Sequence, residues 1–452
     1  MRNVNLSGLR SHNTARVLGL LRAAGGDGVS RLELAERTGL TPQAVSKIAA
    51  RLREEGLVAG AGRGPATGGK PRTLLRLVPG AAHAVGLHLD RDRLTAVLVD
   101  LAGVTVAVRT GPLDLGAGPA HVVAVAAAEV AALRGGGTLM GVGVAMPGPL
   151  DHVAGVPHRV TGFPAWDGYP LRDALRDALR AALRDAGSGE ALEGGVEGAG
   201  AGVAGGAPPG RPAAGRRAPG KRAEGGADTG GGADTGGGPT TGGAGPGGGP
   251  PGAVASTGAG GGAGAGPGEG AGAVAGAGVP PVAVDKDTNA AALALALREP
   301  GGSSFAYVHA GTGLGAGLVL DGAVYRGART GAGEFGHQTV QLDGAPCGCG
   351  GRGCLEALCL AAVARGDLDG AARVLGVGVA NLAGLLDIDR VLLGGRVVAK
   401  APERFVRGVG AALAERARLA GGPEVPAALA PGTPHLVAEG AAQLVLAPVF
   451  GR

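Results

Sequence analysis

The chain has 452 residues and a net charge of +5, with 42 Lys and Arg against 37 Asp and Glu. Its length suits two or three domains better than one. We find no stretch of 18 strongly apolar residues, which argues against a membrane span, and the start of the sequence lacks the apolar core of a signal peptide. We therefore expect a cytoplasmic protein.

The charge is unevenly distributed along the chain. Residues 1–80 carry 13 Lys and Arg against 5 Asp and Glu, which leaves residues 81–452 with a net charge of −3. A basic segment on a mildly acidic body is typical of a nucleic-acid-binding module fused to another domain. The alternative is a drift toward arginine in a GC-rich coding sequence, which the 95 glycines would also reflect.

The amino-terminal segment predicts three short helices. The first covers residues 14–23. Ser30 begins the second, residues 31–38, and Glu33 completes a capping box in which each side chain satisfies a free backbone N–H of the other residue. Thr41 caps the third helix, because a hydroxyl at this position accepts a hydrogen bond from the first turn.

The third helix has one apolar face and one polar face. Its apolar residues follow the helical spacing i, i+3, i+4 and i+7, at Val45, Ile48, Ala49 and Leu52. Two short helices around a glycine turn, the second with a polar and basic outer face, predict a helix-turn-helix. Gln can read adenine and Arg can read guanine in the major groove. The candidate DNA contacts on this helix are Thr41, Gln43, Ser46, Lys47 and Arg51.

Two strands, residues 57–60 and 73–78, follow the helices and enclose a basic loop. With the helices they predict a winged helix-turn-helix domain over residues 1–80. In the wing, Lys70 and Arg72 are candidate contacts to DNA phosphates or the minor groove. The alternative is a winged helix that binds protein instead of DNA.

From residue 81 the pattern changes to that of an α/β domain. Three strands with short turns, which predict an antiparallel meander, cover residues 85–89, 94–100 and 104–110. A helix, a buried strand and an amphipathic helix follow at residues 121–133, 139–146 and 170–186. Later in the chain come a strand running into a helix, a hairpin, a helix, a strand and two final helices, beginning near residues 280, 305, 371, 390 and 396.

Residues 187–278 interrupt this pattern. They consist almost entirely of Gly, Ala, Pro, Thr and Ser, with GADTGGGADTGGG as a near-repeat. Such a segment cannot bury enough apolar area to offset roughly 1–2 kcal/mol of backbone entropy per residue. We therefore predict a disordered insert between the two parts of the α/β domain.

All four cysteines fall within residues 347–359, which favours metal binding over a disulfide framework. Three thiolates and one imidazole satisfy the tetrahedral preference of structural zinc, and four protein ligands leave no open position for catalysis. The candidate zinc ligands are His337, Cys347, Cys349 and Cys354. Cys359 is predicted to belong to the core of the next helix. The alternative is a set of buried free thiols.

The segment PCGCGGRGCLE, preceded by GAGEFGH, resembles the signature of the ROK family of repressors, open reading frames and sugar kinases. The segments GVAMPGPLD, DKDTNAAALA, GTGLGAG and VLLGG follow in the family's order. The resemblance covers residues 10–186 and 279–452, and the winged helix resembles the head of the family's repressors. It implies an α/β, actin-like (ribonuclease-H-like) fold, with a first lobe at residues 81–186 and a second at residues 279–452.

The resemblance also implies a sugar site in the cleft between the lobes. It assigns sugar contacts to Gly148, Asp287, Glu334, His337 and Glu356, and in the family's kinases the equivalent of Asp287 is the general base. The chain departs from the family at two further positions, where Lys286 and Gly162 replace asparagines.

The phosphate loops distinguish a kinase from a regulator. The family's kinases have a Gly-Gly-Thr turn after the first strand, where this chain has residues 88–93 with Asp90 and Asp92. Repulsion and steric blocking are both expected to oppose ATP, because glycines normally let backbone N–H groups approach the phosphates. The second phosphate turn survives as Gly311, Thr312 and Gly313.

These features predict a regulator, most simply a repressor, that binds double-stranded operator DNA as a homodimer and responds to a sugar or sugar phosphate. Structural zinc is its expected cofactor, and it is not expected to be an enzyme. Two alternatives stay open: an ATP-dependent, glucokinase-like sugar kinase, and a ligand-binding pseudo-kinase that acts through protein contacts. The chain is shorter than the family usually is between Glu356 and Val374, a region that could contribute to the dimer contact.

Overall fold

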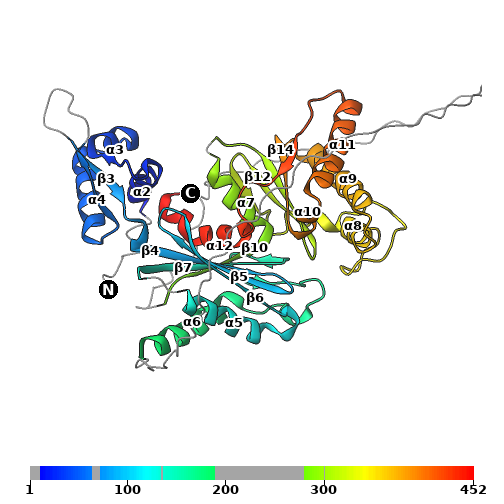
Figure 1. Ribbon diagram of the computed structural model, residues 1–452, viewed down its shortest axis with the longest axis horizontal. Coiled ribbons are helices and arrows are strands. Elements are labelled where there is room, and N and C mark those ends of the chain that lie inside the picture. The colour runs from blue at the N-terminus through cyan, green and yellow to red at the C-terminus, as the bar shows by residue number, and fades with distance from the viewer. Residues whose placement is uncertain (1–10, 64–71, 134–135, 189–278, 300) are drawn as a thin grey trace, which may run out of the picture. The chain divides into compact units, whose positions relative to one another are not determined.

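The computed structural model describes residues 11–63, 72–133, 136–188, 279–299 and 301–452 (Figure 1). Lys70, a predicted DNA contact, and nearly all of the predicted insert at residues 187–278 lie outside the described residues. The described chain forms an amino-terminal helical domain and a mixed α/β body.

The amino-terminal domain has the predicted winged helix-turn-helix arrangement. Its elements are α2 (His12–Ala24), β1 (Val29–Ser30), α3 (Arg31–Thr38), α4 (Pro42–Glu54), β2 (Val58–Arg63) and β3 (Thr73–Leu77). The strands form an antiparallel sheet in the order β1-β3-β2. The two-residue strand β1 was not predicted, because it is too short to show an alternating pattern.

The two helices of the helix-turn-helix begin at the predicted capping residues. Ser30 Oγ accepts a hydrogen bond from the Glu33 backbone N–H at 3.2 Å, and Thr41 Oγ1 accepts one from the Ala44 N–H at 3.2 Å. Each bond satisfies a donor that the helix start leaves free. The Glu33 carboxylate pairs with Arg37 instead of returning to Ser30, so the capping box forms in one direction.

The body contains two five-stranded sheets of the same topology, each with an antiparallel meander extended by two parallel strands. The first has the order β10-β7-β4-β5-β6, from β4 (Ala82–Leu89), β5 (Arg93–Asp100), β6 (Thr105–Pro112), β7 (Thr138–Met146) and β10 (Val282–Lys286). The second has the order β13-β12-β11-β14-β15, from β11 (Phe305–Ala310), β12 (Leu314–Leu320), β13 (Ala323–Tyr325), β14 (Arg390–Gly394) and β15 (Ala427–Leu429). This is the predicted two-lobed α/β arrangement, with one sheet in each lobe.

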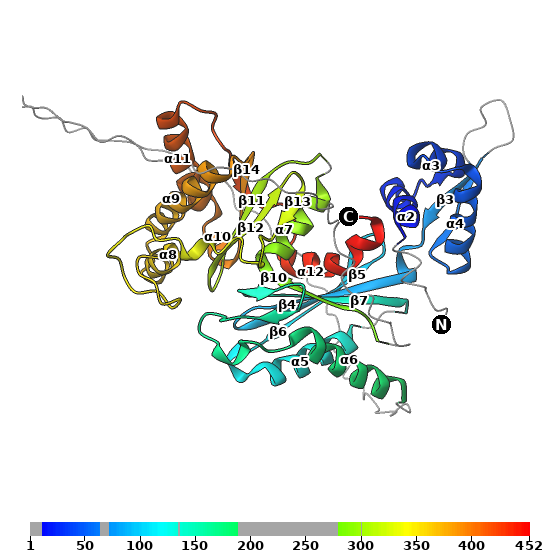
Figure 2. The same cartoon turned by 180° about the vertical axis from the view of Figure 1, so that it is seen from behind.

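Helices cover both sheets. The first sheet has α5 (Pro119–Ala132) and α6 (Leu171–Ser188) on one face and α12 (Leu436–Leu446) on the other (Figures 1 and 2). The helix α7 (Asp287–Arg298) packs on both β12 and α12. The second lobe also holds α8 (Leu355–Ala364), α9 (Leu368–Leu386), α10 (Arg396–Lys400) and α11 (Pro402–Ala420). A short pair, β8 (Leu150–Asp151) and β9 (Val156–Pro157), follows β7.

The lobes do not divide where the sequence predicted. The strand β10, which follows the predicted insert, pairs in parallel with β7 of the first lobe, and α12 near the end of the chain packs on β4 and β7. Assigning all of residues 279–452 to the second lobe was therefore wrong. The sequence shows that a buried strand is present there, but a continuous apolar strand carries no signal of which strand it pairs with.

Two glycines bring α12 close to the first sheet. Gly86 on β4 and Gly143 on β7 are partners across the sheet. A Cβ at Gly86 would collide with the Ala438 carbonyl oxygen, and one at Gly143 with the Ala441 carbonyl oxygen. The helix backbone therefore lies directly on the strands, with no side-chain layer at this point.

We expect Gly143→Ala to destabilise the fold by about 1–3 kcal/mol or more, because α12 or the sheet must move to admit the methyl group. Gly111→Ala on β6 is the matched control, since a Cβ there would meet no atom within 4 Å. Thermal unfolding of both purified variants measures the difference. Equal unfolding temperatures for the two variants would contradict the close packing.

The amino-terminal domain shares buried contacts with the body. The helix α2 packs against the final turn η5 (Ala447–Phe450), and residues of α2 and α4 belong to the same buried cluster as residues of β4, β5 and α12. The Arg22 guanidinium lies over the Phe450 ring, 4.7 Å from its centroid, and Nε donates to the Ala102 carbonyl at 2.9 Å. The head therefore meets the end of the chain and the first lobe directly.

Among the described residues, one helix is long and apolar enough to cross a membrane, namely α9. About half of it is buried inside the fold, and it packs on α8 and α11. A core helix satisfies the same criteria of length and composition.

Candidate functional site

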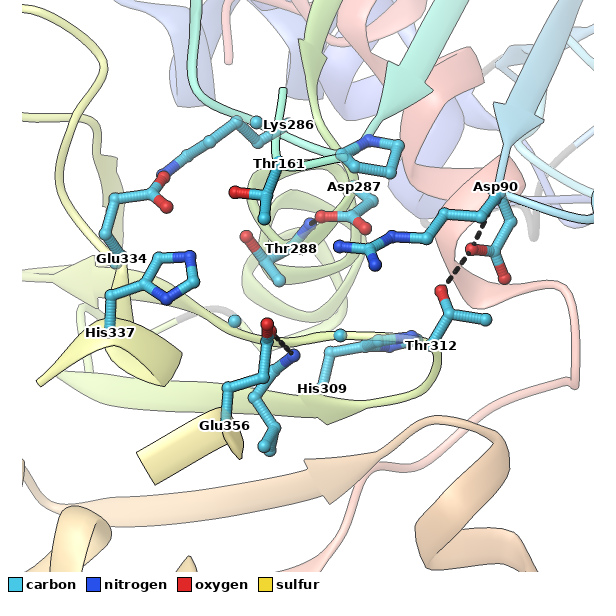
Figure 3. Close-up of a pocket in the computed structure, with 17 residues that line it drawn as sticks. Asp90, Thr161, Lys286, Asp287, Thr288, His309, Thr312, Glu334, His337 and Glu356 are labelled. Carbon is cyan, nitrogen blue, oxygen red and sulfur yellow. Dashed lines mark hydrogen bonds and ion pairs between the residues drawn. The ribbon is translucent and has the colours of Figure 1, made fainter. Parts of the chain in front are cut away.

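A pocket between the two sheets collects the residues that were predicted to bind a sugar (Figure 3). It is lined by the β4–β5 turn, the end of β7, the start of α7, the β11–β12 turn and the segment before the cysteine cluster. All five predicted sugar contacts line it, namely Gly148, Asp287, Glu334, His337 and Glu356. Two residues of the predicted phosphate turn, Thr312 and Gly313, line it as well. The structure thus brings together residues separated by more than half of the chain.

Asp287 is the first residue of α7 and is partly exposed to this pocket. One of its oxygens accepts a hydrogen bond from the Thr288 N–H at 2.6 Å. Burial raises the pKa of the Asp287 carboxyl to about 7, and the neighbouring carboxylates of Asp90 and Glu334 act in the same direction. A carboxyl that changes charge near neutral pH can accept a proton from a ligand hydroxyl, and such shifted groups are concentrated at functional sites.

The raised pKa of Asp287 makes stability depend on pH. Because the folded chain holds this proton more tightly than the unfolded chain, the stabilisation is complete below about pH 4 and is lost as the pH rises to about 7. We expect Asp287→Asn, which cannot ionise, to be more stable than the parent at pH 8 by about 1–3 kcal/mol, with a smaller difference at pH 5. Urea unfolding between pH 5 and pH 8 measures this. A difference that stays constant with pH would contradict the raised pKa.

Lys286 occupies the place where the family resemblance expects an asparagine. Its side chain passes close to Gly148, where a Cβ would meet the lysine Cδ, and the residue is only 2% exposed. Nζ donates to Glu334 Oε1 at 3.1 Å and to the Ala332 carbonyl oxygen. One of the two Glu334 oxygens is therefore engaged by a buried cation, which leaves the other for a ligand.

Three polar residues of the pocket were missed from the sequence, namely Thr161, Thr288 and His309 (Figure 3). Thr161 and Thr288 each lie next to a position that the family motif singled out, and that proximity was the available signal. His309 lies on β11, where Nδ1 is 2.9 Å from the Tyr307 hydroxyl, and burial lowers the pKa of its imidazole. Nothing in the strand pattern distinguished its side chain from a core residue.

The β4–β5 turn connects the two lobes through a set of contacts that we call the Asp90 latch, formed by Asp90, Asp92, Thr312 and Arg396. The Thr312 hydroxyl donates to Asp90 at 2.9 Å. The Arg396 guanidinium, at the start of α10, donates to Asp90 at 3.0 Å and to Asp92 at 2.8 and 3.0 Å. Asp90 is 8% exposed. A first-lobe turn that the resemblance assigns to nucleotide phosphates is thus bonded to the second lobe.

The latch changes the expected reason for poor ATP binding. The sequence predicts that the Asp90 and Asp92 carboxylates repel ATP, but both accept hydrogen bonds from Arg396, whose charge offsets theirs. Side chains and inter-lobe bonds nevertheless occupy the turn where the family's kinases have glycines. Steric occupation of the turn is therefore expected to oppose ATP more strongly than charge repulsion does.

The predicted metal ligands form a compact cluster in the second lobe. One ligand atom from each of His337, Cys347, Cys349 and Cys354 lies within 4.8 Å of all the others. Cys347 Sγ is 3.7 Å from His337 Nδ1, and Cys349 Sγ is 3.7 Å from Cys354 Sγ. Burial and the neighbouring thiols raise the pKa of Cys354 to about 12, so a cation is needed to hold this residue as a thiolate, whereas a backbone hydrogen bond from Gly351 lowers the pKa of Cys349. The donor set therefore suits a metal ion.

His337 and Cys359 take the positions expected of them. His337 directs Nδ1 toward Cys347 while its ring also lines the pocket, so one residue belongs to both predicted sites. Cys359 is fully buried on α8, and its thiol donates to the Ala371 carbonyl at 3.6 Å. It lies outside the cluster, as predicted for a core residue.

Most of the predicted DNA contacts that the structure describes are exposed. Gln43, Ser46 and Lys47 lie on the outer face of α4, and Arg72 is exposed before β3. Thr41 is also exposed, although its hydroxyl already caps the helix.

Arg51 differs from its prediction. It is half-buried, and its Nη2 donates to Thr14 Oγ1 of α2 at 2.6 Å. The outward orientation predicted for this side chain was wrong, because position 51 is three residues after Ile48 and lies at the edge of the buried face. Its guanidinium joins α4 to α2.

The fold and the pocket define a two-lobed α/β protein that carries an amino-terminal winged helix-turn-helix domain. The ROK family profile matches residues 277–364, and the MarR family profile matches residues 7–64. The chain therefore combines a segment similar to the ROK family with an amino-terminal segment similar to the MarR family.

Individual relatives match shorter segments. Kanosamine kinase of Amycolatopsis mediterranei is 35% identical over 134 residues, which are 24% of this chain and 44% of that protein. The xylose repressor of Caldicellulosiruptor bescii is 46% identical over 54 residues, which are 12% of this chain and 14% of that protein. The chain thus spans less than half the length of these relatives. A crystal structure of a ROK family transcriptional regulator, a homolog of the E.coli MLC protein, covers 96% of this chain and 95% of its own, with a TM-score of 0.61 and 17% identity, which shows a shared fold.

Proposed function

We propose that the protein is a transcriptional repressor that binds operator DNA and is released from it by a sugar or sugar phosphate. The observation that carries this proposal is the combination of an exposed polar face on α4 with a pocket that gathers all five predicted sugar contacts. The similarity to a xylose repressor and to a ROK family regulator supports it. The target is double-stranded DNA in the cytoplasm.

A continuous series of packing contacts from the pocket to the winged helix-turn-helix domain supports control of DNA binding by the ligand. The pocket residue Asp287 begins α7, α7 packs along α12, and the turn η5 that follows α12 packs on α2 of the helix-turn-helix. In the proposed homodimer, a ligand that changes the separation of the lobes would change the spacing of the two heads. Half-sites on DNA have fixed spacing, so such a change lowers affinity.

Two further roles belong to the proposal. The cysteine and histidine cluster holds structural zinc, because three thiolates and an imidazole at these separations match its preferred ligands. The chain does not phosphorylate its ligand, because the Asp90 latch occupies the turn where kinase relatives have glycines.

The test is binding of the full-length protein to a labelled duplex from its own upstream region, measured by fluorescence anisotropy at several salt concentrations. We expect sequence-selective binding that weakens with salt and is reversed by one member of a panel of sugars and sugar phosphates. Absence of selective binding, even at low salt, would refute the repressor role and favour the pseudo-kinase that acts through protein contacts.

A sugar kinase is the second candidate, and the position of Asp287 in the pocket favours it, since a carboxyl with a pKa of about 7 suits a general base. A coupled assay of ADP release over the same sugar panel separates the two. Turnover that Asp287→Asn abolishes would establish the kinase instead of the regulator.

A further inference from the structure

Arg91 places a guanidinium in the pocket at a position where the resemblance predicts glycine. It lies in the β4–β5 turn between the two aspartates of the Asp90 latch, is partly buried, and lines the pocket. A Cβ built on Gly313 would be 3.3 Å from Arg91 Nη2, so the guanidinium lies over the β11–β12 turn. Its Cζ is 5.8 Å from the centroid of the Phe163 ring, within the range of a cation–π contact.

The carboxylates of this pocket already have partners. Asp90 accepts from Thr312 and Arg396, and Glu334 accepts from Lys286. Glu356 accepts from the Leu314 N–H at 2.8 Å, and Asp287 accepts from the Thr288 N–H. None of the four is within ion-pair distance of Arg91.

The Arg91 guanidinium, in contrast, forms no hydrogen bond or ion pair with any residue that the structure describes. The hydrogen bonds of Arg91 are made by its backbone, whose N–H donates to Asp90 and whose carbonyl accepts from the Leu115 N–H. A guanidinium presents five donors in a planar fork, and an oxyanion that accepts two of them in parallel is its preferred partner.

The turn beneath Arg91 offers further donors. Gly311 N–H is bonded to the Gly313 carbonyl, whereas the N–H groups of Thr312 and Gly313 have no acceptor within the described chain. The absence of a side chain at Gly313 leaves the space between this turn and Arg91 open, since a Cβ would approach both Arg91 and Glu356. Backbone N–H groups without an acceptor, close to a cation, form a suitable cradle for a phosphate.

We propose that the effector is a phosphorylated sugar, and that Arg91 together with the Thr312–Gly313 turn holds its phosphate while the five predicted sugar contacts hold its hydroxyls. This assignment rests on the proposed function, which names a sugar or a sugar phosphate as the effector, and it selects the sugar phosphate. The same arginine makes the pocket selective, because a neutral sugar leaves the guanidinium unpaired.

The test is isothermal titration calorimetry of the full-length protein with glucose, mannose and N-acetylglucosamine, each beside its 6-phosphate, and with inorganic phosphate and ATP. We expect at least one 6-phosphate to bind about 10-fold or more tightly than its parent sugar. Arg91→Gln should reduce that 6-phosphate to the affinity of the parent sugar, and Arg91→Lys should retain part of the preference, because it keeps the charge without the fork.

Arg93→Gln is the matched control, since Arg93 is two residues away, exposed, and outside the pocket lining. It should bind the 6-phosphate like the parent protein, and thermal unfolding establishes that all three variants are folded. A preference for the phosphate that survives in Arg91→Gln overturns the proposal. So does equal binding of sugar and 6-phosphate, an inorganic phosphate affinity that matches the 6-phosphate, tighter binding of ATP, or no binding by any member of the panel.

Operator binding without ligand is measured on the same preparations and separates the two hypotheses. If Arg91→Gln binds operator DNA like the parent but is not released from it by the 6-phosphate, both the repressor role and the assignment of Arg91 are supported. If operator binding is selective and a neutral sugar releases it in both proteins, the repressor role holds and the phosphate assignment fails.

Discussion

Replacing Gln43 and Lys47 together with alanine is expected to lower operator affinity by about 10- to 100-fold, because a paired base contact from Gln contributes about 1–3 kcal/mol and the lysine adds a phosphate contact. Both side chains are exposed on the outer face of α4. Fluorescence anisotropy across a salt series should also show a shallower salt dependence, since one phosphate contact is lost.

The matched control for this double variant is Lys400→Ala. Lys400 is an exposed lysine at the end of α10 in the second lobe, so its loss changes the net charge by the same amount without touching α4. Operator affinity that falls equally in both variants would mean that net charge, and not the recognition helix, governs binding.

Cys354→Ser is expected to abolish stoichiometric zinc binding and to lower the thermal unfolding temperature of the second lobe. Cys354 is 1% exposed and lies at the start of α8, so its loss removes a ligand from the buried side of the cluster. Structural zinc sites contribute directly to folding, and three remaining ligands leave the ion open to water. Metal analysis by mass spectrometry and thermal unfolding with and without a chelator measure both effects.

Cys359→Ala provides the comparison for Cys354→Ser. It removes another buried thiol of α8, but one that donates to a backbone carbonyl and lies outside the cluster. It should therefore keep one zinc ion per chain and keep the chelator sensitivity of the parent. A parent protein that contains no zinc, or Cys354→Ser protein that retains a full equivalent, would contradict the assignment.

Local features of this fold could be predicted from the sequence, and long-range ones could not. Ser30 and Thr41 predict helix starts because a hydroxyl before an amphipathic segment can accept a hydrogen bond from a free backbone N–H of the first turn. The structure confirms both caps. The cluster of His337, Cys347, Cys349 and Cys354 could be predicted because thiolate spacing in a glycine-rich loop restricts the chemistry. The pairing of β10 with β7 is different, since it depends on contacts across a long segment of chain.

In the pocket too, some residues could be predicted from the sequence and others could not. Motif resemblance brought together Asp287 and Glu334, but it carried no information on side chains that are particular to this chain. Arg396 pairs with a turn more than 300 residues earlier, and the guanidinium of Arg51 bonds to Thr14 instead of facing outward. Such contacts depend on the relative placement of elements, which periodicity along one helix or strand does not encode.

In the Asp90 latch, the same residues determine both the contact between the lobes and the access of phosphates to the β4–β5 turn. Protein engineering cannot change one of these properties without the other. Restoring adjacent glycines at Asp90 and Arg91, as in the Gly-Gly-Thr turn of the family's kinases, would at the same time delete the inter-lobe bonds of Asp90 to Thr312 and Arg396. The glycine variant would therefore have an accessible phosphate turn, but its two lobes would no longer be hydrogen-bonded to each other at this turn. New hydrogen bonds or ion pairs between the lobes would have to be introduced elsewhere first. The order of substitutions therefore matters as much as their identity.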